Sequence, residues 1–111
     1  EETAGTGVLC YIDAGSETTY AFRTDMDGLS IVENNEIDFK STHPDMMHAC
    51  GHDGHAAALL GAAKKLASER NFGGKVVLVF QPGEEGWSGA KHMMEDGLFE
   101  RFSDAGNLCP P

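Results

Sequence analysis

The sequence has few cysteines and no paired cysteine motif. Its three cysteines, Cys10, Cys50 and Cys109, are widely separated, and none belongs to a Cys-x-x-Cys pair. Their odd number and wide spacing argue against a disulfide framework and against a zinc module with four cysteine ligands. We therefore expect a protein of a reducing compartment, and we predict cytoplasmic localisation.

Basic residues are also scarce, and long apolar runs are absent. Eight Lys and Arg residues stand against 18 Asp and Glu residues, which gives a formal net charge of -10. This charge opposes binding to phosphate backbones and anionic lipids, so neither nucleic acid nor a membrane is an expected partner. No apolar stretch approaches the roughly 18 residues needed to span a bilayer. The chain starts with Glu1 rather than Met, and we expect this start to be a cut inside a longer protein.

The rest of the composition is typical of a folded domain. Hydrophobic residues make up 41% and charged residues 23% of the 111 residues, which is close to globular averages. Two short runs rich in β-branched and aromatic residues, 7–12 and 18–24, flank a polar segment with turn chemistry, so we predict a hairpin. Residues 28–44 have no sustained periodicity and are predicted to form an irregular connection.

Helical and strand patterns alternate in the second half of the sequence. An apolar stripe at helical spacing predicts a helix from about His55 to Arg70 that ends where Gly73 and Gly74 adopt the left-handed conformation. The continuous apolar run 75–80 predicts a buried central strand. A second helix is predicted over residues 89–96, capped by Ser88 and ended by Gly97. This order predicts an α/β layered domain.

A dense group of metal-ligand residue types follows the irregular connection. Cys50 and His52 are one residue apart, so in an extended or looped segment both side chains can reach one cation. A thiolate and an imidazole suit zinc, cobalt or nickel. Asp53 can accept a proton from an imidazole nitrogen, and His55 adds another imidazole. The alternative is that Cys50 is a small buried residue and that the histidines are surface or helix-capping groups.

Two adjacent carboxylates, Glu84 and Glu85, follow the predicted central strand within a turn rich in Pro and Gly. A charged pair is costly there unless it is solvated or meets a cation. Consecutive side chains diverge, so one carboxylate can bind a metal while the other acts as a general base for water. The alternative is a solvated acidic turn. Trp87, beside the pair, is expected to pack against the core rather than to line a pocket.

Other polar residues have weaker signals. Asp25 and Asp27 lie two residues apart at the end of a predicted strand, where metal binding, orientation of a ligand and turn formation all remain open roles. The remaining histidines have no identifiable partners and are predicted to be structural: His43, His48 and His92.

Three segments, 23–29, 47–55 and 80–86, resemble successive motifs of the M20 metallopeptidases. They read Arg-Thr-Asp-Met-Asp-Gly-Leu, Met-His-Ala-Cys-Gly-His-Asp-Gly-His and Phe-Gln-Pro-Gly-Glu-Glu-Gly. The motifs are similar to those of the branch that contains hippurate hydrolase, N-acyl-amino-acid amidohydrolases and plant auxin-conjugate hydrolases. The resemblance covers roughly residues 7–105, in the family's order and spacing.

This resemblance implies a zinc-peptidase-like catalytic domain with a mixed sheet flanked by helices, of which residues 1–111 form only a part. It implies that Cys50, His52 and Glu85 bind metal, that Glu84 is the general base and later the proton donor, and that Asp27 orients a ligand. Two divalent ions, Zn, Mn, Ni or Co, would serve hydrolysis of the amide bond of an N-acyl amino acid or a small peptide. The lid and dimerisation domain, through which the family forms homodimers, is absent from this sequence.

Two alternatives accompany this hypothesis. The family supplies a further histidine ligand shortly after a motif resembling Asp104-Ala105, but this sequence continues with Gly106 and ends at Pro111. The chain could therefore be a non-catalytic fragment that folds and at most binds a metal or a partner. A structural cysteine-histidine metal module is disfavoured, because no second ligand pair has suitable spacing. The residues that bind substrate, and the choice among hippurate, N-acetyl amino acids, N-acetyl-diaminopimelate and peptides, are not predicted.

Overall fold

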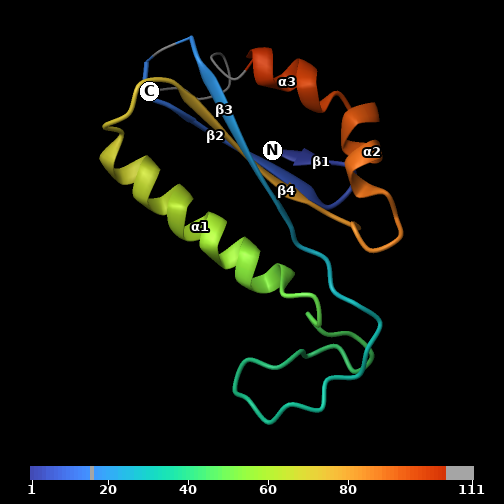
Figure 1. Cartoon of the computed structure of the whole chain (residues 1–111). Helices are drawn as coiled ribbons and strands as arrows, with labels where there is room; N and C mark the ends of the chain where they lie inside the picture. The colour runs from blue at the N-terminus through green and yellow to red at the C-terminus, as the bar shows by residue number, and fades with distance from the viewer. Residues whose placement is uncertain (16, 105–111) are drawn as a thin grey trace.

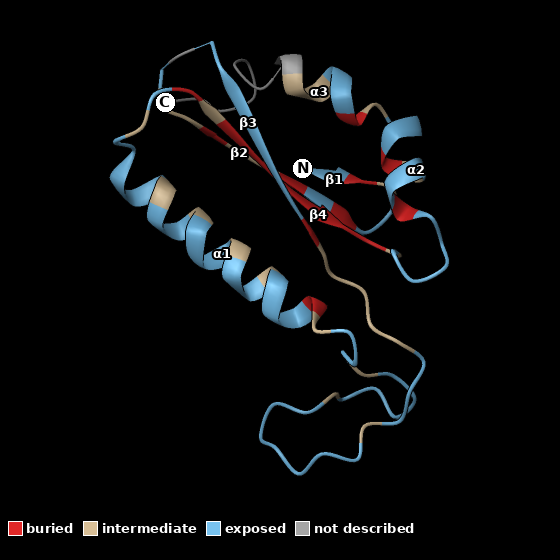
Figure 2. Cartoon of the chain, in the orientation of Figure 1, coloured by how far each residue is buried: buried red, intermediate tan, exposed pale blue. Residues whose placement is uncertain are grey.

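Strand β4 (Lys75–Gln81) lies inside a mixed four-stranded sheet whose order is β1-β2-β4-β3. The computed structural model describes residues 1–15 and 17–104. The elements are β1 (Glu2–Thr3), β2 (Gly7–Asp13), β3 (Thr19–Asp25), α1 (His52–Glu69), β4, α2 (Gly89–Glu95) and α3 (Leu98–Asp104). The apolar run of β4 is buried along its length, as Figure 2 shows, because both faces of the strand are covered. The predicted central strand is confirmed.

The predicted hairpin is wrong. β2 pairs with β4 in antiparallel fashion and β3 pairs with β4 in parallel fashion, so β4 separates the two strands that the sequence had suggested as partners. Only β4 is apolar on both faces and gains from an interior position, whereas five of the seven residues of β3 are exposed. The connection from β3 through α1 to β4 is a crossover, which two parallel strands require.

Helices cover both faces of the sheet (Figure 1). Side chains alternate along β4: Val76, Leu78 and Phe80 face the side of α1, and Val77 and Val79 face the side of α2 and α3. The α1 side is completed by partly buried residues of the helix, including Leu59, Ala63 and Leu66. The opposite side is completed by Leu9, Met93, Leu98 and Phe102. The layered α/β prediction is confirmed.

Several element boundaries differ from the prediction. Helix α1 begins at His52, three residues earlier than expected, and Arg70 rather than a glycine takes the left-handed conformation at its end, with φ 44°. Helix α2 begins after Ser88 as predicted, but the Ser88 side chain makes no capping hydrogen bond and its φ is 59°. Gly97 follows α2 with φ 82°, as expected for a helix stop.

The segment between β3 and α1 is irregular, as predicted, and in Figure 1 it extends away from the sheet. An isolated bridge between Leu29 and Met47 ties its two ends together. Strand β1 and helix α3 were not predicted, because both are short and lack a clear period. Among the described helices, none combines the length and apolar character needed to cross a membrane.

Candidate metal centre

Three chain segments meet beyond the carboxyl ends of β3 and β4. The two strands are parallel and end together, with Asp25 in register with Gln81. Asp27 therefore lies beside the turn that carries Glu84 and Glu85, and the start of α1 supplies the third segment. Convergence of polar residues at the carboxyl edge of parallel strands is the usual location of a site in α/β sheets.

Cys50, His52 and Glu85 form the only group of three or more potential metal ligands found among the described residues. One ligand atom from each, the Cys sulfur, a His ring nitrogen and a carboxylate oxygen, lies within 4.8 Å of the other two. His52 is buried, whereas Cys50 and Glu85 are exposed. The structure thus brings together the three residues that the sequence singled out as ligands.

Asp27 fixes the orientation of the His52 ring. The Nδ1 atom of His52 lies 3.1 Å from Oδ1 of Asp27 and 3.2 Å from the Asp27 backbone oxygen. Both Asp27 atoms are acceptors, so a hydrogen bond requires the proton on Nδ1 and leaves the lone pair of Nε2 for a cation. A carboxylate behind a histidine ligand is a common arrangement in metal sites. The sequence had suggested Asp53 as an acceptor for an imidazole, but Asp27 contacts His52.

The second carboxylate oxygen of Asp27 accepts a hydrogen bond from the turn that carries Glu84 and Glu85. The Glu85 backbone N–H donates to Oδ2 of Asp27 at 2.9 Å. Burial raises the pKa of Asp27, but the backbone hydrogen bonds, led by that from Glu85, outweigh it and place the pKa below its usual value. Asp27 is therefore ionised at neutral pH, and one side chain links the His52 and Glu85 segments.

The Cys50 thiol lies among carboxylates. Its pKa is raised, first by a side-chain hydrogen bond with Glu85, then by burial and by the charges of Glu85, Glu84 and Asp27. Several negative groups around a thiol favour its protonated form unless a cation offsets them. The donor set of sulfur, imidazole and carboxylate matches what zinc and similar divalent ions bind. The residues present therefore fit a divalent metal.

Gly51 provides the backbone turn between Cys50 and His52. Its φ is 86°, in the left-handed region, and it is the residue that immediately precedes α1. An L-residue with a Cβ is strained in this conformation. The backbone turn at Gly51 sets Cys50 before the helix and His52 in its first turn, where both reach the same point.

Comparisons with known proteins identify the family of the chain. The sequence model of peptidase family M20/M25/M40 matches residues 21–108. The chain belongs to this family. The prediction of M20 membership is therefore confirmed, and the proteins that the chain resembles are hydrolases.

Two curated relatives of this M20-family chain illustrate the similarity. It is 52% identical over 103 residues to hippurate hydrolase of Campylobacter jejuni, a match that covers 92% of this chain and 27% of the relative. It is 55% identical over 96 residues to IAA-amino acid hydrolase ILR1-like 2 of Arabidopsis thaliana. This match covers 86% of this chain and 22% of that relative. The M20-family chain thus spans about a quarter of the length of these relatives.

A solved structure supports the fold. The YXEP protein of Bacillus subtilis, described as a dinuclear metal-binding peptidase of the M20 family, superposes with a TM-score of 0.78 at 39% sequence identity. The match covers 84% of this chain and 27% of that protein. The prediction of a zinc-peptidase-like α/β domain with a mixed sheet is confirmed.

Other residues singled out in the sequence of this M20-family chain lie outside the cluster. Asp25 pairs with Arg23, and Arg23 also donates to Gln81 at 2.9 Å. The His55 ring is exposed, and its centroid lies 6.1 Å from that of His52. Glu84 is exposed in the turn beside Glu85 but does not belong to the three-ligand group. Cys109 lies outside the described residues.

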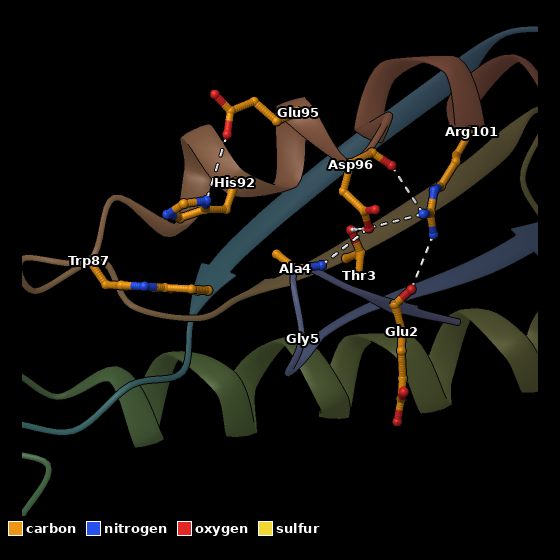
Figure 3. Close-up of a pocket in the computed structure, with 9 residues that line it drawn as sticks. All are labelled: Glu2, Thr3, Ala4, Gly5, Trp87, His92, Glu95, Asp96 and Arg101. Carbon is orange, nitrogen blue, oxygen red and sulfur yellow. Dashed lines mark hydrogen bonds and ion pairs between the residues drawn. The ribbon is translucent and has the colours of Figure 1, made fainter.

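The remaining histidines belong to two separate pockets. His43 and His48 line a cavity of about 430 Å³ in the irregular segment, together with Asp53. His92 stacks on Trp87 with ring centroids 4.4 Å apart, and both line a shallow pocket of about 640 Å³ (Figure 3). The expectation that Trp87 packs against the core is wrong, because the residue is 50% exposed.

Sequence reasoning missed a polar network at the wall of that pocket. Asp96 accepts hydrogen bonds from Thr3 Oγ1 at 2.7 Å and from the Ala4 backbone at 3.2 Å, and Arg101 lies 3.0 Å from the same carboxylate (Figure 3). First the Thr3 hydroxyl and then the Ala4 N–H lower the pKa of Asp96. The network ties β1 to the helices. No sequence signal pointed to it, because its members are far apart in the chain.

Proposed function

We propose that this chain contributes a metal-binding half-site to an enzyme that hydrolyses the amide bond of N-acyl amino acids or small peptides. The observation that carries the proposal is the convergence of Cys50, His52 and Glu85 within 4.8 Å, from two segments that lie 33 to 35 positions apart. The names of the relatives, hippurate hydrolase and IAA-amino acid hydrolase, support N-acyl amino acids as the substrate class.

In this proposal, His52 binds a divalent ion through Nε2 while Asp27 holds Nδ1. Cys50 and Glu85 complete the ligands that this chain provides. When bound, the ion would supply Lewis acidity toward the substrate carbonyl and the attacking water. Asp27 holds the His52 imidazole and the Glu85 backbone in place through its two carboxylate oxygens. Neither group would therefore need to move when His52 and Glu85 bind an ion.

Glu84 is proposed as the general base. It lies in the same turn as Glu85, and because consecutive side chains diverge, its carboxylate is left free of the metal ligands. It would take the proton from the attacking water and deliver it to the amine as the amide C–N bond breaks. Its exposure in this chain is compatible with this role, because a base of this kind must reach both water and substrate.

The three ligands are fewer than a two-ion site requires. We propose that further ligands, including histidines, and a lid and dimerisation domain are provided by polypeptide outside residues 1–111. The metals would be Zn, Mn, Ni or Co, and the site of action the cytoplasm. The dinuclear relative from B. subtilis supports the number of ions.

A second candidate function is that the chain binds a metal but does not catalyse. The observation that favours it is that the described residues hold a single three-ligand group. The two candidates share the same ligands and differ in whether hydrolysis occurs, so activity measurements separate them.

The test compares Glu84→Gln with wild type in the full-length protein that contains this segment. Hydrolysis of hippurate and a panel of N-acetyl amino acids is measured together with metal content by mass spectrometry. We expect Glu84→Gln to lose at least a hundredfold in kcat, as loss of a general base does, and to keep its metal. Glu95→Gln, a change of an exposed carboxylate on α2, serves as the matched control and should be fully active.

Unchanged hydrolysis in Glu84→Gln would refute the assigned base. Absence of hydrolysis by the metal-loaded wild type on every substrate of the panel would favour the non-catalytic candidate. Loss of metal in Glu84→Gln would mean that Glu84 is a ligand rather than the base.

A further inference from the structure

Trp87 is the only tryptophan of the chain, and it lies in the turn that carries Glu84 and Glu85. The residue is half exposed, so its indole belongs neither to the core nor entirely to solvent. Two groups that contact the indole are Gly83, at the start of the same turn, and His92 of α2. Trp87 thus connects the acidic turn with a neighbouring helix.

The indole of Trp87 packs directly on Gly83. A Cβ atom at Gly83 would lie 2.6 Å from Cε3 and 2.8 Å from Cβ of Trp87, so the tryptophan occupies the space of the missing side chain. The two ends of the turn are also joined through the backbone, because Gly89 N–H donates to the Gly83 carbonyl oxygen at 3.0 Å. Trp87 therefore folds back onto the start of a turn that is closed at its base.

His92 holds the indole of Trp87 on α2. The two ring centroids are 4.4 Å apart and the ring planes are inclined by 26°, so the rings are stacked (Figure 3). Stacked aromatic rings stabilise each other beyond the area that they bury. Helix α2 is itself fixed to the sheet, because Met93 is buried in the core and a Cβ at Gly89 would lie 1.6 Å from the Pro82 carbonyl oxygen. The stack therefore connects the turn to an anchored helix.

Asp27 and Trp87 contact the same turn at different points. Asp27 accepts the Glu85 N–H at 2.9 Å, and Trp87 lies two positions further along the chain. Glycines flank the acidic pair, with φ 58° at Gly83 and 96° at Gly86. Because glycine leaves the backbone more conformational freedom than any other residue, a turn of this composition needs contacts from outside to keep one conformation. Asp27 and Trp87 provide two such contacts.

We propose that Trp87 is a positioning residue for the proposed metal centre. Its indole, packed on Gly83 and stacked on His92, keeps the acidic turn in one conformation. That conformation places Glu85 beside the other two potential ligands and leaves Glu84 outside the ligand group. The roles of Glu84 and Glu85 rest on the proposed function, whereas the conformation of the turn can be measured without a metal.

The first test measures hydrogen exchange of the Glu85 amide in the metal-free chain, because this amide donates to Asp27 only while the turn keeps its conformation. We expect Trp87→Ala to accelerate exchange at Glu85 about two- to tenfold, the range that corresponds to loss of one aromatic stack. Trp87→Phe retains a ring that can stack and should exchange as wild type does. The amides of Val77 and Val79 in β4 serve as internal references and should not change in either variant.

The second test is calorimetric titration of the same variants with Zn²⁺. Trp87→Ala should weaken binding about two- to tenfold, because the ion must then order the turn as it binds. His92→Phe should bind zinc as wild type does, since it keeps a stacking ring but can neither bind a metal nor pair with Glu95. The matched control is Phe99→Ala, which removes another exposed aromatic contact, the edge-on pair with Phe102 on α3, and should leave zinc affinity unchanged.

Unchanged exchange at Glu85 in Trp87→Ala would overturn the proposal. So would faster exchange with unchanged zinc affinity, because the turn would then be ordered without consequence for the ligand. If Trp87→Ala also accelerates the reference amides of β4, the milder variant His92→Ala decides: faster exchange at Glu85 alone supports the proposal, and unchanged exchange overturns it. Failure of the wild-type chain to bind zinc would refute the proposed metal centre, whereas the exchange of the metal-free Glu85 amide would still show whether Trp87 fixes the turn.

Discussion

At the scale of single residues, Asp27 connects the parts of the proposed metal centre. One of its carboxylate oxygens contacts the His52 ring and the other accepts the Glu85 N–H. The side chain therefore fixes a ligand from the helix and the turn that follows β4 at the same time. Its neighbour in the strand, Asp25, has the same chemistry but pairs with Arg23 instead.

This difference predicts the effect of neutralising each carboxylate. Asp27→Asn should weaken metal binding about 10- to 100-fold, because removal of the group behind a histidine ligand has this effect in metal sites. Calorimetric titration of the chain with Zn²⁺ measures the change. The matched control, Asp25→Asn, should bind zinc as wild type does. Equal affinities for wild type and Asp27→Asn would show that Asp27 does not support the ligand.

Much of the residue-level site could be predicted from sequence. Cys50 and His52 were recognisable by ligand type and spacing, and the choice of Glu85 over Glu84 came from the family resemblance; the structure brings these three residues together. The roles of Asp25 and Asp27 stayed open, because they depend on which residue each carboxylate meets. Arg23 and Asp25, two apart in a strand, lie on the same face and offered a signal for their pairing.

At the scale of the elements, the pairing of the strands was the main error. Residues 7–12 and 18–24 are adjacent in sequence and look like a hairpin, but β4 comes between them. A local turn pattern carries no information about a strand 50 or more positions away that is apolar on both faces and pairs with both segments. The same arrangement makes β3 and β4 parallel and so creates the edge at which the potential metal ligands meet.

The start of α1 gives a prediction that separates backbone strain from helix propensity. Gly51→Ala should lower the free energy of unfolding by roughly 1–2 kcal/mol, because alanine is strained in the left-handed conformation. Gly54→Ala, inside the helix with no atom within 4 Å of the added Cβ apart from its chain neighbours and the adjacent helix backbone, should instead raise it by roughly 0.5–1 kcal/mol. Urea denaturation measures both. A stabilised Gly51→Ala would show that the turn between Cys50 and His52 needs no glycine.

At the scale of the whole molecule, the chain spans about a quarter of the length of its relatives and presents three potential metal ligands at one edge of a layered α/β domain. The layered fold could be predicted because the periods of α1 and β4 are strong. The strand order could not, because it depends on contacts between segments that are far apart in the sequence.

The measurement that tests the metal centre most directly is a titration of the chain with Co²⁺, followed by visible absorption. We expect one saturable equivalent with a thiolate-to-cobalt charge-transfer band, and loss of that band in Cys50→Ser. The matched control is Cys10→Ser, which removes the other free cysteine among the described residues and should keep the band. Absence of saturable binding in the wild type, or a band that survives in Cys50→Ser and disappears in Cys10→Ser, would contradict the proposed centre.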